Sequence, residues 1–520
     1  MLTRIKVNNY KGFKEAEIPI KPITVFLGAN SSGKSSILQL LLLLQQTAEE
    51  MSDSYRSALK IYGNRISVGD PENLFYCLDC TVPIRIQIDF KNKWLCLKMQ
   101  KAIEGFLDYI LPLSFIINES GKRERKFLSR EELEELLKRE IGHQEKIRAV
   151  WSLRTEFISY HDVFTKNIES LLRNYDFLLA LKNKIKDETF SFKYTISYDG
   201  ANKNLAILDF TLQQDDVTIL SYESKNGFSS EIIKFNEDDL KCLKKSYQTS
   251  TIFNLFKFAD RDDSDNTSLG KSMLNIVIKA LSELQSEFKD SQINHVSPLR
   301  AHPQRYYMLD KANVTYTLDT YDANAIAEVI KDVEPLKNKV NNWFNQFGIE
   351  VDIDEFKEVI HKIKVIQHGV KLDIPDVGFG ISQVLPVILQ GFLSPSKSVT
   401  IVEQPEVHLH PKMQAALADL FIDITAESNF TKSLIIETHS EYLLGRLRRR
   451  MAEREKITND KVSINLFHTR NEGIPATIEN LPIEERGSFE WPEELYGGEL
   501  LEDTTVFLKK QSNGGLYINN

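Results

Sequence analysis

The sequence predicts an α/β protein with an antiparallel β-subdomain and an inserted helical region, and three observations lead to this prediction. Residues 23–44 read as a short apolar strand, a glycine-bounded loop and an apolar helix. Two further apolar segments, 399–402 and 432–437, read as buried strands. Residues 190–235 alternate with a period of two and contain Asp-Gly and Asn-Gly turns, which is typical of an antiparallel meander.

The loop that begins at Gly28 matches the phosphate-binding pattern G-x-x-x-x-G-K-[ST]. Gly28 and Gly33 let the backbone approach a phosphate closely, and the amide groups of the loop and the new helix point toward it. Lys34 can reach the β- and γ-phosphates, and the Ser35 hydroxyl can ligate Mg²⁺. The flanking strand and helix are the context that this motif requires. The candidate nucleotide-binding residues here are Gly28, Asn30, Ser31, Ser32, Gly33, Lys34, Ser35 and Ser36.

Length and composition limit the class of protein. The 520 residues, 42% hydrophobic and 27% charged, predict about two or three globular domains. No apolar run approaches the ~18 residues of a membrane span, and the amino terminus lacks a signal-peptide core, so we expect a cytoplasmic protein with no membrane partner. The net charge of −9 means that nucleic acid must be contacted through a local patch or a partner. We interpret Cys77 and Cys80, a C-x-x-C pair, as small buried thiols.

Periodicity predicts the remaining elements in chain order. Strands are expected at 2–7, 16–20, 84–90 and 294–297. A capping box at Ser129 and Glu132 opens an amphipathic helical stretch that continues to about residue 186. Residues 236–290 look helical with a polar loop at 260–266, and one helix is expected at 324–347.

Polar side chains follow the two buried strands of the second half. Glu403 follows the strand at 399–402, and a Mg²⁺-nucleotide site needs such a carboxylate opposite the phosphate loop. His439 follows the strand at 432–437, at the edge where a γ-phosphate sensor is expected. Upstream, a glycine-rich turn runs into a helix, and Ser382 near its start offers a second anion-binding place.

Together these blocks resemble the ABC-type ATPase heads of the SMC, RecF and OLD kind. Residues 28–36 are similar to Walker A, 378–383 to the signature motif, 401–406 to Walker B, and 437–440 to the segment with the switch histidine. The blocks NYKGFK, SPLRAHPQRYY, EQPEVHLHP and WPEELYGG resemble a narrower set of stand-alone bacterial predicted ATPases. The resemblance covers residues 1–45 and about 290–500, and it implies an ABC-type P-loop NTPase head with a mixed sheet.

The resemblance also implies roles for single residues. The nucleotide would be ATP with Mg²⁺, bound by Lys34 and Ser35, with Glu403 in place of the usual Walker B aspartate. His439 would sense the γ-phosphate. In such heads the signature of one copy completes the phosphate loop of the other, which implies a homodimer or a higher homo-oligomer. The signature residues that would contact the nucleotide of the partner copy are Gly380, Ser382 and Gln383.

One position departs from the family pattern. The general-base glutamate of these heads should follow the Walker B acid, and Gln404 stands there. An amide cannot accept a proton from the attacking water, although it can orient that water as a glutamine does in small GTPases. Glu406 could supply the carboxylate instead. We therefore expect an ATPase of low turnover, with the catalytic candidates Glu403, Gln404, Glu406 and His439.

Three functions remain open. No Asp-x-Asp constellation follows His439, so we expect no Toprim nuclease domain of the OLD kind. By analogy with the ATPase halves of anti-phage defence pairs such as Septu and retron-linked systems, the ATP-dependent dimer would control an effector, such as a nuclease encoded nearby. The alternatives are a RecF/SMC-like DNA-repair ATPase that binds DNA directly, and a nucleotide-gated scaffold with little hydrolysis.

Each of two groups of arginines has two possible interpretations. Arg300 and Arg305 are either phosphate or carboxylate clamps or members of structural ion pairs. The other group is either a nucleic-acid contact or a solvated helix face, and it consists of Arg446, Arg448, Arg449 and Arg450.

The predicted organisation of the chain has six segments. They are an ATPase N-terminal lobe with Walker A (1–100), a helical insertion (101–185), a β-meander completing that lobe (186–235), a helical connector (236–290), an ATPase C-terminal lobe with signature, Walker B and switch histidine (291–485), and a C-terminal tail (486–520).

Overall fold

The computed structural model describes most of the two predicted lobes. The described residues are 1–96, 188–257, 269–308 and 322–490, except positions 51, 53, 54, 94, 249, 358 and 472, together with isolated positions between 115 and 181 and residue 506. The predicted capping-box helix at Ser129, most of the helical insertion, the polar loop at 260–266 and nearly all of the tail after residue 490 lie outside the described residues. None of the described helices is long and apolar enough to cross a membrane.

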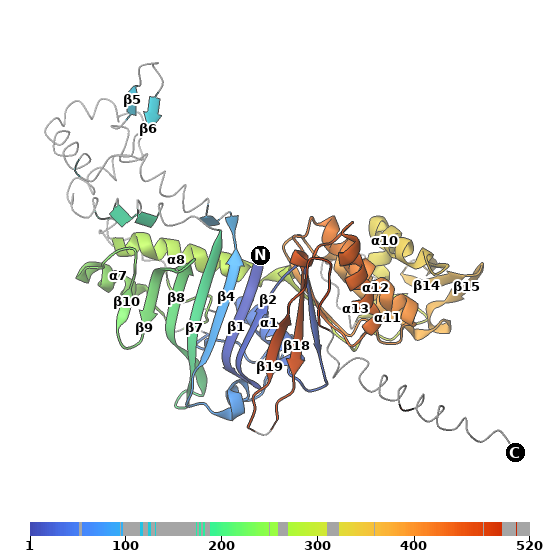
Figure 1. The fold of residues 1–520 in the computed structure, drawn as a ribbon, viewed down its shortest axis with the longest axis horizontal. Helices are drawn as coiled ribbons and strands as arrows, with labels where there is room; N and C mark the ends of the chain where they lie inside the picture. Colours follow the sequence, from blue (N-terminus) through green and yellow to red (C-terminus); the bar gives the residue numbers. More distant parts are fainter. Residues whose placement is uncertain are drawn as a thin grey trace.

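A seven-stranded antiparallel sheet forms one half of the molecule, and it joins the amino-terminal strands to the meander through the pairing of β4 with β7 (Figure 1). Buried and more exposed side chains alternate along β4, as expected for a sheet with one face on a core. The strands, in sheet order, are β10 (Gly227–Ser229), β9 (Val217–Glu223), β8 (Asn204–Gln214), β7 (Thr189–Asp199), β4 (Ile84–Lys91), β1 (Leu2–Tyr10) and β2 (Phe13–Pro19). A separate hairpin consists of β5 (Phe115–Ile117) and β6 (Arg123–Arg125).

A six-stranded mixed sheet carries the phosphate loop. Its first five strands are parallel and its last is antiparallel, so the predicted α/β fold with a mixed sheet and an antiparallel β-subdomain is confirmed. The parallel strands are apolar on both faces, because helices cover both. In sheet order the strands are β11 (Ile293–Val296), β16 (Val399–Glu403), β17 (Ser433–Glu437), β3 (Ile23–Gly28), β18 (Val462–His468) and β19 (Thr477–Leu481).

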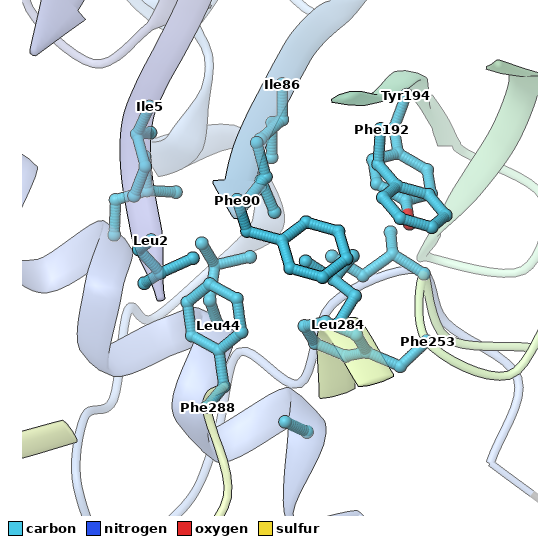
Figure 2. Close-up of a cluster of buried hydrophobic side chains, with 14 of the residues drawn as sticks. Leu2, Ile5, Leu44, Ile86, Phe90, Phe192, Tyr194, Phe253, Leu284 and Phe288 are labelled. Carbon is cyan, nitrogen blue, oxygen red and sulfur yellow. The ribbon is translucent and has the colours of Figure 1, made fainter. Parts of the chain in front are cut away.

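Helix α1 (Lys34–Ala48) lies between the two sheets, and most of its side chains are buried. The core around it takes residues from both sheets, among them Phe90 of β4 and Ile401 of β16. Figure 2 shows Leu44 of α1 close to Phe90 and Phe288 in this core. Helix α8 (Leu269–Ser286) packs into the same core, and α7 (Glu237–Ser246) lies beside it (Figure 1).

The opposite face of the mixed sheet carries a second core. Five helices contribute to it: α9 (Ala323–Asp332), α10 (Glu334–Asn345), α11 (Phe379–Leu393), α12 (Pro411–Glu427) and α13 (Glu441–Glu453). A four-stranded sheet packs beside them, with β12 (Tyr307–Met308), β13 (Ile349–Lys357), β14 (Ile360–Gln367) and β15 (Val370–Asp373). Short 3₁₀ helices are η1 (Pro71–Leu74), η2 (Tyr76–Leu78), η3 (Asp290–Gln292), η4 (Ile374–Asp376) and η5 (Asn459–Lys461).

Two local predictions were wrong. The single helix predicted at 324–347 is two helices, because Val333 leaves the helical conformation and Pro335 lies in the first turn of α10, where its missing N–H costs nothing. The thiol of Cys77 is exposed rather than buried, because Cys77 sits in a surface turn with a left-handed backbone (φ 55°).

Candidate nucleotide-binding site

The phosphate loop runs from the end of β3 into α1, and two glycines are required by their surroundings. Gly28 has a φ of +146°, and a Cβ there would lie 2.5 Å from the carbonyl oxygen of Phe467. Gly33 has a φ of +100°, and a Cβ there would lie 2.5 Å from the ring of Phe13. The loop can therefore keep this shape only with glycine at both ends.

Lys34 points back into the loop that precedes it. Its Nζ donates hydrogen bonds to the carbonyl oxygens of Gly28 and Ala29, both at 2.9 Å. The same Nζ lies 3.7 Å from Oε1 of Glu437. Burial lowers the pKa of Lys34, and the charge of Glu437 opposes that shift. The cation is thus held at the place where the motif requires it to meet phosphate.

The remaining loop residues differ in their exposure. Ser35 is exposed in the first turn of α1, and Ser32 is buried with no hydrogen-bond partner for its Oγ among the described residues. Ser31 has a left-handed backbone with a φ of 64°, while Asn30 is exposed and Ser36 half-buried. The structure therefore brings all eight predicted loop residues to the junction of β3 and α1.

Two glutamates end the neighbouring parallel strands β16 and β17. Glu403 stands opposite Glu437 in the register, and Glu437 stands opposite Phe26 of β3. Parallel strands bring their carboxyl ends to one edge of a sheet, so both glutamates lie beside the phosphate loop. Burial raises the pKa of Glu437 to about 6; Lys34 opposes this shift, while Glu403 and Glu406 add to it.

Sequence reasoning missed two residues of this edge. Glu437 was included only as the end of a strand, although an acid at the carboxyl end of a buried strand is the signal that had identified Glu403. His295 was not recognised because the partner of its strand could not be known; β11 pairs with β16, and Nε2 of His295 lies 2.6 Å from Oε1 of Glu403.

His439 follows β17, and its backbone N–H donates to Oε1 of Glu406 at 2.7 Å. Burial, and then the charge of Lys34, lower the pKa of the His439 imidazole, which favours its neutral form. Its Nε2 is buried and has no hydrogen-bond partner among the described residues. Burial also raises the pKa of Glu406. The structure thus couples Glu406 and His439 through the main chain.

Gln404 has a left-handed backbone with a φ of 44°. Its N–H donates to the carbonyl oxygen of Glu437 at 2.7 Å, so the turn after β16 is fixed to the end of β17. The arrangement holds the main chain of Gln404 at the sheet edge, next to Glu403.

The signature residues lie against the turn that follows β16. A Cβ on Gly380 would lie 2.6 Å from the carbonyl oxygen of His408, so α11 approaches this turn closely. The Ser382 hydroxyl donates to the carbonyl oxygen of Phe379, and the side-chain nitrogen of Gln383 is buried without a partner among the described residues. Across the described part of the chain, none of these side chains is hydrogen-bonded to the phosphate loop.

Arg300 fixes α11 to the Walker B turn. Its guanidinium donates to the carbonyl oxygens of Gln383 (3.1 Å), Glu403 (2.7 Å) and Gln404 (3.4 Å). Burial lowers the pKa of Arg300 to about 10, and the charges of Glu406 and Glu403 oppose that shift. Of the two interpretations of Arg300, the contacts favour a structural one.

The other candidate cations are paired with acids. Arg305 pairs with Asp373 and Asp376 across the surface. On α13, the ion pairs are Arg446 and Arg450 with Asp419, and Arg449 and Arg450 with Glu453, while Arg448 stacks over the ring of Phe489. These contacts favour a structural role for both groups of arginines.

The donors at the sheet edge fit a magnesium ion. Mg²⁺ usually takes one or two carboxylates together with substrate phosphates and water, and Ser35 and Glu403 offer oxygen donors of this kind. No group of three or more His, Cys, Asp or Glu side chains in the described residues could hold a metal ion without such substrate ligands. His410 instead caps α12 by accepting the N–H of Lys412.

A model of the AAA ATPase domain family matches residues 1–444 of this chain. The chain belongs to the AAA ATPase domain family. The match to this family spans the phosphate loop, α11, both strand-end glutamates and His439. The predicted ATPase domain is thereby confirmed at the level of the family. A comparison with curated proteins gives no match.

Solved structures of SMC heads are similar to this AAA ATPase domain protein only distantly. The SMC head domain from Thermotoga maritima shares 10% identity at a TM-score of 0.35, over 93% of this chain and 99% of that chain. An SmcHead bound to the C-winged helix domain of ScpA shares 10% at a TM-score of 0.38, over 93% and 98%. An Smc head with an extended coiled coil, bound to the C-terminal domain of ScpA derived from Pyrococcus furiosus, shares 12% at 0.34, over 98% and 99%.

Proposed function

We propose that this protein binds ATP with Mg²⁺ and hydrolyses it slowly, and that an ATP-dependent homodimer controls an associated effector. One observation supports nucleotide binding above all. Lys34, Glu403, and the pair Glu437 and His439 come from three separate segments, and they meet at the carboxyl edge of one parallel sheet. Such an edge is where open α/β sheets bind ligands, and the phosphate loop lies on it.

Each residue has a role in this proposal. Lys34 and the loop amides bind the β- and γ-phosphates, while Ser35 and Glu403 hold Mg²⁺. The bound metal would neutralise charge that develops on the transferred phosphoryl group. His295 fixes the carboxylate of Glu403 by a contact of 2.6 Å. His439, kept neutral by burial, is placed to sense the γ-phosphate.

The low turnover rests on Gln404. Its side chain is an amide, which can orient a water molecule but cannot accept its proton, so a carboxylate from another position must act as the base. We expect a base displaced from position 404 to give slow turnover. A turnover near ~100 per second, well above the median of about 10 per second for enzymes, would contradict this part of the proposal. Turnover that is undetectable while ATP still binds would favour the nucleotide-gated scaffold.

The homodimer is supported by the orientation of the signature residues. Gly380 lies against the carbonyl of His408, and the carbonyl of Gln383 accepts a hydrogen bond from Arg300. No described hydrogen bond joins the two residues to the phosphate loop of their own chain. In a homodimer, the signature residues of one copy would contact the nucleotide bound at the phosphate loop of the other copy. Sedimentation velocity with ATP and with ADP tests this: ATP should shift the protein to the dimer, and ADP should not.

Control of an effector, such as a nuclease in anti-phage defence, is proposed over direct DNA binding. The arginines of α13 are paired with Asp419 and Glu453, which weakens the case for a basic patch that binds DNA. Purification from the native operon, followed by ATPase assays with and without DNA, separates the two functions. Stimulation by bare DNA without a partner would overturn the effector version.

Nucleotide binding itself is tested by Lys34→Ala. We expect ATP affinity, measured by titration calorimetry with Mg²⁺, to fall at least tenfold, because the cation on the phosphates is lost. The matched control is Lys456→Ala, which removes a mostly exposed lysine that pairs with Asp423 away from the loop. If Lys34→Ala binds ATP as tightly as this control, the proposed function fails.

A further inference from the structure

Glu437 lies in the candidate site but takes no part in the phosphate and magnesium binding proposed for Lys34, Ser35 and Glu403. It ends the strand that lies between the phosphate-loop strand β3 and the Walker B strand β16. The residue is 5% exposed. Its Oε1 lies 3.7 Å from Nζ of Lys34, and its Oε2 is buried with no hydrogen-bond partner among the described residues.

Each neighbouring candidate for a proton acceptor has another contact through one oxygen or lacks a carboxylate. Glu403 shares its Oε1 with His295, and it is the proposed ligand of the metal. Glu406 uses its Oε1 to accept the N–H of His439, which holds the turn after β17. Gln404 is an amide. Glu406 and Glu437 each keep a buried Oε2 without a hydrogen-bond partner among the described residues. Glu437 is distinguished by its Oε1, which lies 3.7 Å from Nζ of the phosphate-binding Lys34.

We propose that Glu437 is the general base of this ATPase, in place of the glutamate that the family pattern expects at position 404. This inference rests on the proposed function. Lys34 donates to the carbonyl oxygens of the loop and lies beside Glu437. Phosphate attracts Lys34 away from that carboxylate, so the base becomes free when the substrate is bound.

The reaction step balances with these groups. The oxygen of a water molecule forms a bond to the γ-phosphorus, and the bond from that phosphorus to the β–γ bridging oxygen breaks. The electron pair of the broken bond stays on ADP. The proton of the water goes to the carboxylate of Glu437, which later releases it to solvent, so ATP and water yield ADP and phosphate.

The alternative is that Glu437 only balances the charge of Lys34. The two roles predict different kinetics for Glu437→Gln, which removes the charge and keeps the shape. A general base contributes typically about 10²–10⁴-fold to the rate. We therefore expect kcat to fall at least about 10²-fold, while the Kd for ATP stays within about threefold of wild type or tightens. A charge-balancing role predicts a changed Kd with kcat within about threefold.

The experiment compares five proteins by steady-state ATPase assays and by titration calorimetry with ATP. They are wild type, Glu437→Gln, Glu437→Asp, Glu406→Gln and the control Glu427→Gln, which neutralises a surface Lys–Glu pair with Lys339 away from the site. Glu437→Asp keeps a carboxylate on a shorter chain, so its kcat should lie between those of wild type and Glu437→Gln. Glu427→Gln should leave both constants unchanged. If Glu437→Gln fails to fold, Glu437→Asp alone decides, and an unchanged kcat would overturn the assignment.

Failure of this inference can be told apart from failure of the proposed function. If wild type binds and cleaves ATP and Glu437→Gln cleaves it within about threefold of that rate, only the role of Glu437 is wrong. A larger loss in Glu406→Gln than in Glu437→Gln would transfer the base to Glu406. If wild type does not bind ATP, the proposed function falls first.

Discussion

At the scale of single residues, burial sets the charges of the site. Glu437 and Lys34 are both almost inaccessible, at 5% and 3% exposure, and each is shifted toward its neutral form. An ionised carboxylate in such a place is destabilised by lost hydration, and one lysine at 3.7 Å compensates only in part. The ionised form of Glu437 is therefore less favourable in the folded protein than in water.

The raised pKa of the buried Glu437 carboxyl group predicts that the stability of the fold depends on pH. The pKa of Glu437 is raised from 4.5 to about 6, so the folded state binds its proton more tightly than the unfolded state. The proton on Glu437 contributes about 2 kcal/mol to the free energy of unfolding. This contribution is fully present below pH 4.5 and is lost as pH rises through 6. Urea unfolding of wild type and Glu437→Gln from pH 4 to pH 7.5 measures it as the difference between the two curves. A difference that stays constant across this range would contradict the prediction.

At the scale of elements, the segment from 297 to 305 joins α11 to the turn that follows β16. Arg300 is 6% exposed and serves three carbonyl oxygens that would otherwise lack this donor. Arg305 lies five residues later with its side chain 51% exposed, and it pairs with acids at the surface. The two arginines look alike in the sequence, but their burial makes them energetically different.

We expect Arg300→Met to lower the free energy of unfolding by about 2–3 kcal/mol, because it leaves buried carbonyl groups without their donor. The matched change Arg305→Met should cost no more than about 1 kcal/mol, since exposed ion pairs contribute little. Both are measured by urea unfolding at pH 7. Equal costs for the two substitutions would mean that Arg300 does not hold α11 to the turn.

The sequence was most informative where the pattern of one segment decides its structure. The phosphate loop, the strand ahead of Glu403 and the meander follow from local periodicity and glycine spacing, and the structure has them. Strand order depends on distant pairing, so the contact between His295 and Glu403 could not be predicted. The helix break at Val333 was missed because apolar periodicity continues across it and only Pro335 interrupts the chain.

At the scale of the whole molecule, α1 connects the two sheets through one core. Leu43 is fully buried in a cluster that contains residues of both the antiparallel and the mixed sheet. The match to the family at residues 1–444 includes the antiparallel sheet and four of the six strands of the mixed sheet. Neither sheet can bury its inner face without this helix, so we expect both to unfold together.

Leu43→Ala should therefore destabilise the molecule by about 2–5 kcal/mol, the usual cost of emptying a core leucine site. The control Leu299→Ala removes a leucine that is 76% exposed and should cost less than about 0.5 kcal/mol. Circular dichroism and tryptophan fluorescence follow the unfolding, and the two midpoints should coincide. Separate midpoints in Leu43→Ala would show that the sheets unfold independently.

The ring of Phe13, at the turn between β1 and β2, lies where any side chain on Gly33 would have to go. The first hairpin of the chain therefore packs against the phosphate loop and limits which residue can stand at position 33. A larger residue at position 33 would therefore need a second change that repacks this hairpin, because the ring of Phe13 fills the space that its side chain would take.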